Sequence, residues 1–109
     1  MASLTQLHSV EQLEQFVNQP GKRLLFKHST ICPISTSAHD EFSAFLEENE
    51  LPAAIVLVRE DRPVSNDIAE RYGIKHESPQ IFLLEDGSVK WHTSHWKITR
   101  QAIAEAVQA

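Results

Sequence analysis

Residues 24–35 read LLFKHSTICPIS and contain the only cysteine of the chain, Cys32. The run Leu24-Leu25-Phe26 predicts a strand that is covered on both faces and is therefore central in a sheet. Pro33 falls at the first helical position, which proline favours. After the cysteine, apolar residues recur at the spacing of one helix face: Ile34, Ala38, Phe42, Phe45 and Leu46. We therefore expect Cys32 to lie where a central strand ends and a helix begins.

Further helices and strands are predicted on either side of this stretch. Ser9 and Gln12 have the spacing of a capping box, and Thr99 can cap a helix near the C-terminus. Asp86-Gly87 is a strong hairpin signal. The predicted order is a lead-in 1–8 without regular structure, helix 10–17, strand 23–27, helix 33–49, strand 54–58, polar turn 59–63, helix 65–72, strands 80–84 and 88–93, and a last helix after residue 99.

This order of elements predicts the fold class. Two strands joined by a helix should be parallel with a right-handed crossover, whereas the last two strands should form an antiparallel hairpin. The result is an α/β fold with a four-stranded mixed sheet and helices on both faces, the thioredoxin-like arrangement. The chain has 109 residues and no linker or repeat, so residues 1–109 are expected to form a single domain.

Composition argues against several classes of function. The formal net charge of −5, without a Lys/Arg cluster, argues against binding of nucleic acid. No apolar run approaches the roughly 20 residues of a membrane span, and residues 1–10 do not read as a signal peptide, so we expect no membrane association. A single cysteine cannot form an internal disulfide. This is typical of a reducing compartment, and we expect a cytoplasmic protein.

The predicted position of Cys32 favours a reactive thiolate. A helix N-terminus stabilises an anion through its free N–H groups and its dipole, and the thiolate is the nucleophilic form of cysteine. In the pattern C-x-x-S, Ser35 stands where a dithiol oxidoreductase has its second cysteine, and it can donate a hydrogen bond to the thiolate. Such a single nucleophile accepts a thiol group from a mixed disulfide and passes it to an external thiol. The alternative is that Cys32 is a small buried core residue.

A second candidate feature is the dipeptide Ser78-Pro79 before the third predicted strand. Thioredoxin-like folds have a cis-proline at this place in the element order, facing the active cysteine. The residue before it offers its backbone to an extended substrate. We therefore expect a cis bond here, although an ordinary trans-proline that opens a strand is the alternative.

Basic side chains near these two features are candidates for stabilising the thiolate. His28 and Lys27 precede Cys32 at the strand end, and His76 precedes the proline. When protonated, each would favour the thiolate electrostatically; solvent-exposed or structurally hydrogen-bonded side chains are the alternative. One cysteine with scattered histidines lacks the paired spacing of a structural zinc site, so we expect no metal.

Three segments resemble the monothiol bacilliredoxins, the YtxJ-like family of small cytoplasmic thioredoxin-fold proteins with a T-C-P-I-S motif. They are residues 27–35 (KHSTICPIS), 62–66 (RPVSN) and 75–80 (KHESPQ), and the resemblance covers nearly the whole chain. It implies that Cys32 accepts bacillithiol, a low-molecular-weight thiol, from S-thiolated client proteins, with no bound cofactor. The residues expected to contact the substrate are Ile31, Pro33, Ser35, Ser78 and Pro79. Ile31 stands where the family usually has threonine. We therefore expect the substrate preference of this protein, or the access of substrates to the Cys32 sulfur, to differ from the family's.

Two other functions remain open from the residues alone. One is a thioredoxin-like binding module that holds a partner without turnover; slow alkylation of Cys32 at neutral pH would favour it. The other is a glutaredoxin-like monothiol protein that uses a different small thiol. Assays of bacillithiol and glutathione mixed disulfides side by side distinguish this glutaredoxin-like protein from a bacilliredoxin.

Overall fold

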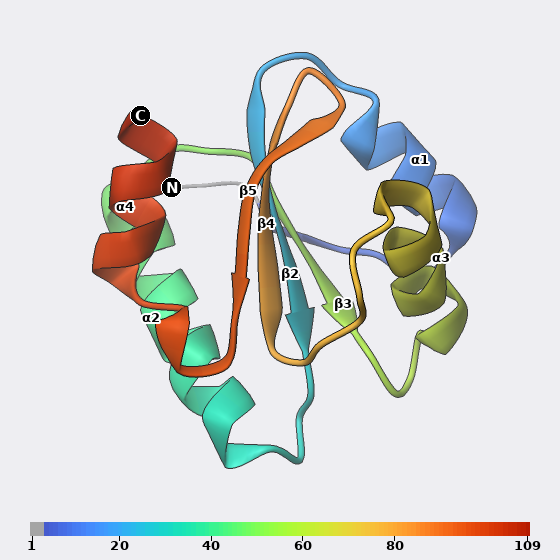
Figure 1. The fold of residues 1–109 in the computed structure, drawn as a ribbon, viewed down its shortest axis with the longest axis horizontal. Coiled ribbons are helices and arrows are strands. Elements are labelled where there is room, and N and C mark those ends of the chain that lie inside the picture. Colours follow the sequence, from blue (N-terminus) through green and yellow to red (C-terminus); the bar gives the residue numbers. More distant parts are fainter. Residues whose placement is uncertain (1–3) are drawn as a thin grey trace.

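A computed structural model describes residues 4–109 as a mixed sheet covered by helices on both faces (Figure 1). The strands are β1 (Leu4–Gln6), β2 (Lys22–His28), β3 (Ala53–Leu57), β4 (Gln80–Glu85) and β5 (Ser88–Ser94). The helices are α1 (Val10–Val17), α2 (Pro33–Glu48), α3 (Arg62–Tyr72) and α4 (Arg100–Gln108), with a 3-10 turn η1 (His95–Lys97) after β5. The predicted thioredoxin-like α/β class is confirmed.

The sheet has five strands in the order β1-β3-β2-β4-β5, rather than the four that we predicted. β2 and β3 are parallel, and β4 is antiparallel to both β2 and β5, as expected. The missed strand is β1, which pairs with β3 from Leu4 opposite Ala53. Its three residues are all exposed, so the segment carries no alternation of apolar and polar residues that would predict a strand. Residues 1–3 of the predicted lead-in lie outside the described part of the chain.

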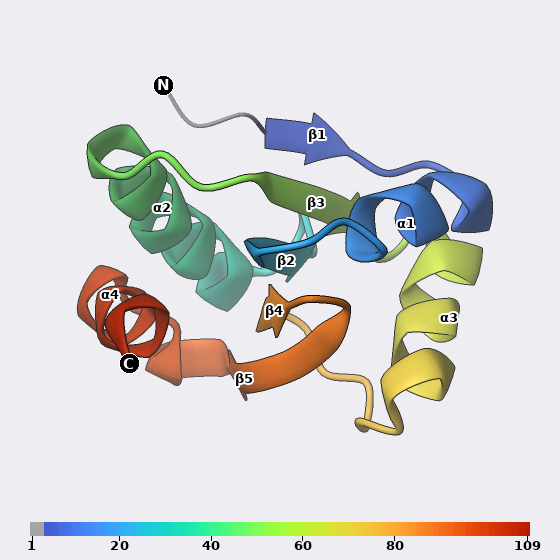
Figure 2. The same cartoon turned by 90° about the horizontal axis from the view of Figure 1, so that it is seen from above.

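Two helical layers sandwich the sheet. Seen along the strands, α2 and α4 cover one face while α1 and α3 cover the other (Figure 2). β2 is buried on both faces, which confirms its predicted central position. Along it, Leu24 and Phe26 pack against the α2 layer and Leu25 packs on the α1/α3 side. The core therefore consists of two apolar clusters that share the central strand as their common wall.

The ends of several elements follow from single residues. Ser9 Oγ accepts the Gln12 N–H at 3.1 Å and caps α1. Asp86 and Gly87 have φ values of 52° and 87°, the left-handed pair of a tight hairpin. α3 begins at Arg62, within the segment that we predicted as a turn, because Pro63 occupies its first turn, where no intrahelical N–H donor is required.

A register shift in the pairing of β4 with β5 changes which faces the residues of β5 occupy. Leu84 pairs with Val89 and Leu83 with Trp91, so Lys90 is the extra residue of a bulge. Val89 then packs on the α1/α3 side while Trp91 packs against the α2 cluster. The alternation predicted for this strand is therefore interrupted at Lys90.

The cap of the last helix gives a stability prediction. Thr99 Oγ1 accepts the Ala102 N–H at 3.1 Å, and α4 carries Ile103 into the α2 cluster. Thr99→Ala should lower the free energy of unfolding by about 1 kcal/mol in urea denaturation. Thr99→Ser keeps the hydroxyl and should lose clearly less. Equal losses in the two variants would contradict the capping role.

Candidate active site

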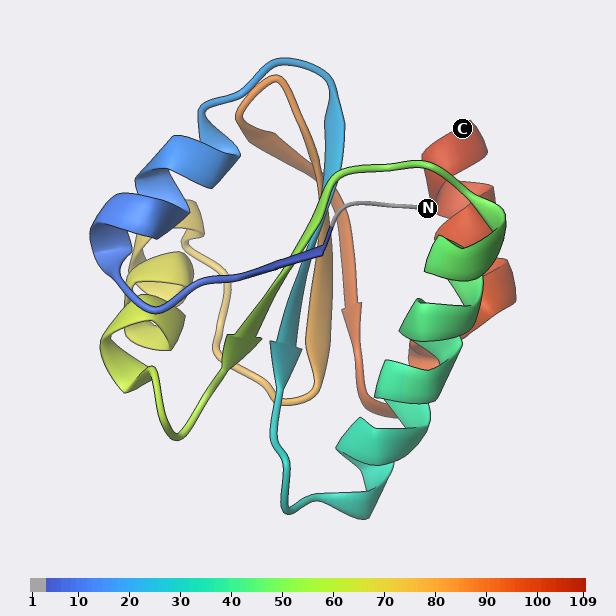
Figure 3. The ribbon, with the colours of Figure 1, turned by 180° about the vertical axis from the view of Figure 1, so that it is seen from behind.

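Cys32 lies in the turn between β2 and α2 and forms the N-cap residue of that helix. The turn stands at one end of the sheet, beyond the arrowhead of β2 (Figure 3). The Thr36 N–H donates to the Cys32 carbonyl at 3.1 Å, which starts the helix, and Pro33 follows in the first turn, as predicted. The thiol is half-buried, and no side-chain capping bond occupies it. The sulfur therefore lies at the N-terminal end of a sixteen-residue helix, where the free N–H groups and the helix dipole favour an anion.

Ser35 is fully buried, and its hydroxyl holds the turn together rather than facing solvent. The Ser29 N–H donates to Ser35 Oγ at 2.9 Å, and Oγ lies 2.7 Å from His28 Nδ1. Because Oγ already accepts from Ser29, its proton is available for Nδ1. The hydroxyl thus has partners other than Cys32. The predicted hydrogen bond from Ser35 to the thiolate would therefore come from the backbone N–H of Ser35.

His28 lies in an aromatic stack that favours its neutral form. Its ring is 4.9 Å from that of His39 and 5.7 Å from that of Phe26. Burial, followed by the charge of His39, holds the pKa of His28 below its usual range, against the opposing effect of Glu60. A neutral His28 carries no charge toward the thiolate, so the electrostatic role that we expected for it is disfavoured at neutral pH.

The Ser78–Pro79 peptide bond is cis, as predicted. Gln80, the first residue of β4, pairs with Lys27 near the end of β2, so Pro79 lies at the same end of the sheet as the Cys32 turn. The side chain of Gln80 is buried and braces the preceding loop, accepting from the Glu77 N–H at 3.3 Å and donating to the Lys75 carbonyl at 3.1 Å. Sequence reasoning missed this role of Gln80, because the bonds depend on the loop conformation.

Lys27 is fully buried on the α1/α3 side of β2. Its Nζ lies 3.1 Å from His76 Nδ1 and 5.9 Å from the centre of the Phe82 ring, and Ser65 Oγ is 3.4 Å from the same His76 nitrogen. Burial lowers the pKa of Lys27 to about 8. Partial burial, followed by the charges of Lys27 and Arg62, lowers the pKa of His76. At neutral pH a charged Lys27 therefore donates to a neutral His76, and its effect on Cys32 stays a prediction.

Two hollows flank the end of the sheet that carries Cys32. One, of roughly 390 Å³, is lined by Thr30, Ile31, Arg59 and Glu60 and lies toward β3. Ile31, directly before the cysteine, is 68% exposed. The other lies between Glu77 and residues 92–97, toward β5, with a volume of roughly 490 Å³. The lining of this second hollow includes His92, His95 and Trp96.

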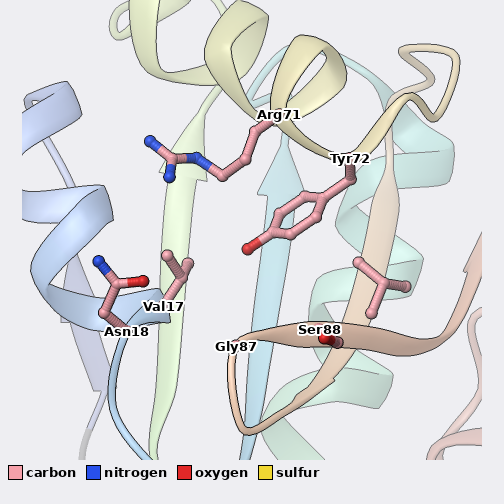
Figure 4. Close-up of a pocket in the computed structure, with 7 residues that line it drawn as sticks. Val17, Asn18, Arg71, Tyr72, Gly87 and Ser88 are labelled. Carbon is pink, nitrogen blue, oxygen red and sulfur yellow. The ribbon is translucent and has the colours of Figure 1, made fainter.

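A further hollow, of roughly 440 Å³, lies between α1, α3 and the β4–β5 turn (Figure 4). β4 is antiparallel to β2 and ends opposite Lys22, so this hollow is at the other end of the sheet from Cys32. The Arg71 guanidinium there is already paired, at 2.9 Å to Asp67 and 3.3 Å to Glu14. This hollow is therefore not part of the candidate active site.

Residues 4–109 contain neither a candidate metal site nor a candidate membrane-spanning helix. No group of three or more His, Cys, Asp or Glu side chains is placed to hold a metal ion in this part of the chain. None of its helices has the length and apolar character needed to cross a membrane.

The fold and the cysteine at the start of α2 define a thioredoxin-fold thiol oxidoreductase. A solved structure described as an oxidoreductase with a thioredoxin fold matches with a TM-score of 0.90 and 35% identity, over 94% of this chain and 92% of that chain. Mitochondrial thioredoxin 3 of Saccharomyces cerevisiae has a TM-score of 0.76 at 15% identity, over 96% of this chain and 93% of its own. Malassezia sympodialis thioredoxin has a TM-score of 0.78 at 14% identity, over 99% and 90%. The latter two share the fold alone.

A family model described as monothiol bacilliredoxin BrxC matches residues 5–103. The chain therefore belongs to the monothiol bacilliredoxin family, in agreement with the resemblance of its three motifs.

The hydrogen bonds of Ser35 give a second prediction. Ser35→Ala leaves the Ser29 N–H and His28 Nδ1 without their partner and should lower the free energy of unfolding by about 1–3 kcal/mol. Ser37→Ala, at an exposed position of the same helix, should change it little. Chemical denaturation of the two variants in parallel measures the difference. A loss no larger than that of Ser37→Ala would contradict the anchoring role of the hydroxyl.

Burial of Lys27 gives a third prediction, on pH. The unfolded chain keeps the lysine proton up to about 10.5, whereas the folded protein releases it near 8. Between these values the unfolded state binds more protons, so raising the pH favours the folded state. In a Cys32→Ser background, which removes the thiol titration, the free energy of unfolding should rise from pH 7.5 to 9.5. Lys27→Met should abolish this rise and be the more stable protein at pH 7, by on the order of 2 kcal/mol.

The measurement is urea denaturation at several pH values. Lys90→Met is the matched control, because Lys90 is exposed and should leave the pH dependence intact. A flat profile in the Lys27-containing protein would show that the buried lysine does not titrate in this window.

Proposed function

We propose that this protein removes bacillithiol from mixed disulfides on client proteins, with Cys32 as its nucleophile. The observation that carries the proposal is the pair Cys32 and Ser35: one thiol at the N-terminus of α2, and a buried hydroxyl where a second thiol would stand. Membership of the monothiol bacilliredoxin family supports the choice of small thiol. Because the site has one thiol, an external thiol has to complete the exchange by releasing Cys32.

The first step is an exchange at one sulfur. The Cys32 thiolate attacks the bacillithiol sulfur of the mixed disulfide and forms a new S–S bond to it. The bond between bacillithiol and the client breaks, and the client sulfur leaves with the electron pair as a thiolate that takes a proton from solvent. The client is reduced, and Cys32 becomes the oxidised partner. The free N–H groups at the start of α2 stabilise the attacking anion before the step.

The second step needs an external thiol. In a dithiol site a neighbouring cysteine would attack the Cys32 adduct, but Ser35 has no sulfur. An external thiolate therefore attacks the bacillithiol sulfur, forms a disulfide with it and releases the Cys32 thiolate. One disulfide is consumed and one is formed, so the two steps balance without a bound cofactor.

The residues around the turn have roles in holding the substrate. The backbone at Ser78 and Pro79 offers a ledge at the same end of the sheet as Cys32, and His95 fixes it through its N–H to the Pro79 carbonyl at 3.1 Å. Pro33 and the exposed Ile31 border the sulfur in sequence. Ile31 thereby presents apolar surface to the client, where the family's usual threonine would present a hydroxyl.

The fourth prediction tests the nucleophile. Wild-type protein should release bacillithiol from a client peptide that carries it as a mixed disulfide, and should then carry the mass of one bacillithiol on Cys32. Cys32→Ala should reduce release to the uncatalysed background, because no other thiol is present in the chain. Thiol release and intact mass are measured together.

Controls for this assay separate the chemistry from the choice of thiol. Ser37→Ala, exposed on α2, should retain the wild-type rate. The same peptide carrying glutathione should react more slowly. Equal rates for wild type and Cys32→Ala would exclude the proposed function, whereas faster release of glutathione would assign the protein to a different small thiol.

A further inference from the structure

The hollow toward β5 adjoins the ledge formed by Ser78 and Pro79. Glu77 on the loop before that ledge and residues 92–97 line it, and its volume of roughly 490 Å³ is typical of sites for small molecules. The His95 N–H donates to the Pro79 carbonyl at 3.1 Å, which joins this wall of the hollow to the ledge. The hollow is therefore a continuation of the active end of the sheet.

Strand register places the hollow at the same end of the sheet as the Cys32 turn. Lys27, Gln80 and Ser94 form one row across β2, β4 and β5. Adjacent strands are about 4.8 Å apart, so the end of β5 lies on the order of 10 Å from the end of β2. Figure 1 shows the β2–α2 turn, the loop before β4 and the segment after β5 at the same end of the molecule.

Exposed apolar side chains stand on both sides of this end. The large apolar residues that are exposed within residues 4–109 are Leu4, Ile31 and Trp96. Ile31 faces the hollow toward β3 and Trp96, 67% exposed, borders the hollow toward β5. Leu4 lies on β1, at the far edge of the sheet. A mixed disulfide also has two halves, a client and a small thiol, that extend in different directions from the reacting sulfurs.

The hollow toward β5 combines an aromatic plane with charges of both signs. Lys97 is exposed beside Trp96. Glu77 accepts the Ser94 hydroxyl at 3.0 Å, and its second oxygen lies 3.8 Å from His95 Nδ1. In a protein with a net charge of −5, a local cation is needed to hold an anionic ligand. Such a set of groups suits a small molecule that has a flat ring face, a carboxylate and an ammonium.

We infer that this hollow binds the part of the small thiol that lies beyond its cysteine sulfur. For bacillithiol, a cysteine linked to glucosamine that carries malate, the sugar face packs on Trp96 and a malate carboxylate pairs with Lys97. The cysteinyl ammonium is directed to Glu77. About nine bonds separate the sulfur from a malate carboxyl carbon, a reach on the order of 10 Å, which is comparable with the width of two strand spacings. The inference rests on the proposed function for the identity of the thiol.

The first test uses glucosaminyl malate, a probe without a sulfur, so it does not depend on thiol exchange. The chain has two tryptophans, which give two indole N–H signals in a ¹⁵N-labelled protein. Titration of Cys32→Ser protein should shift the Trp96 signal in a saturable manner and leave that of the half-buried Trp91 nearly unchanged. Lys97→Gln should weaken binding of glucosaminyl malate more than binding of glucosamine. A Trp96 signal that does not move overturns the inference.

The second test, the fifth prediction, measures rates. Trp96→Ala should raise KM for a bacillithiol mixed disulfide about tenfold, with kcat within about twofold, because one aromatic contact to the bound ligand is lost. The same client carrying cysteamine, a thiol without sugar or carboxylate, should react as with wild type. Leu4→Ala removes an exposed apolar side chain on β1 and is the matched control. Equal losses with both disulfides would assign Trp96 to packing and overturn the inference.

The two tests separate this inference from the proposed function. Release of bacillithiol by wild type together with an unmoved Trp96 signal retains the function and overturns the hollow as its binding site. A shifted Trp96 signal without any release of bacillithiol retains the hollow as a site for the sugar acid and overturns the proposed function.

Discussion

The hydroxyl of Ser35 is the contact on which the presentation of Cys32 depends. It accepts the Ser29 N–H and meets His28, so one buried group ties the end of β2 to the first turn of α2. The five residues between Ser29 and Ser35 have little freedom to move the sulfur away from the helix N-terminus. A thiol at the same position would be a weaker acceptor. The residue that denies the site a second sulfur therefore also holds the first one in place.

The histidines at positions 28 and 76 contribute little positive charge near Cys32 at neutral pH. Burial lowers the pKa of His28 and of His76, and it lowers that of Lys27 to about 8. His28 and His76 are then neutral at physiological pH, and Lys27 donates a hydrogen bond to His76 on the α1/α3 side of the sheet. The start of α2 adds a positive potential next to Cys32, and this potential does not depend on a proton that titrates.

Sequence patterns predicted those parts of the molecule in which burial repeats regularly. The apolar run of β2, the helical face of α2 and the hairpin at Asp86-Gly87 all follow local rules, and so does the cysteine between the first two. β1 was not predicted from the sequence, because a three-residue exposed edge strand is defined only by its pairing with β3. Two contacts were not predicted: that of Lys27 with His76 and that of Gln80 with its loop. Each joins segments that come together only in the complete fold.

A one-cysteine site requires an asymmetric surface. The client must leave while the small thiol stays on the sulfur, and a second thiol must then approach in line with the new S–S bond. A surface that bound the client and the small thiol equally well would retain the client after the first step. A surface that bound neither would not orient the mixed disulfide for attack. The order of strands supplies the asymmetry: the hollow toward β3 has the exposed aliphatic side chain of Ile31, whereas the hollow toward β5 has the aromatic ring of Trp96. With the small thiol bound in the hollow toward β5, as we infer, the other side would stay open, and the departing client and the incoming thiol would use the same path in turn.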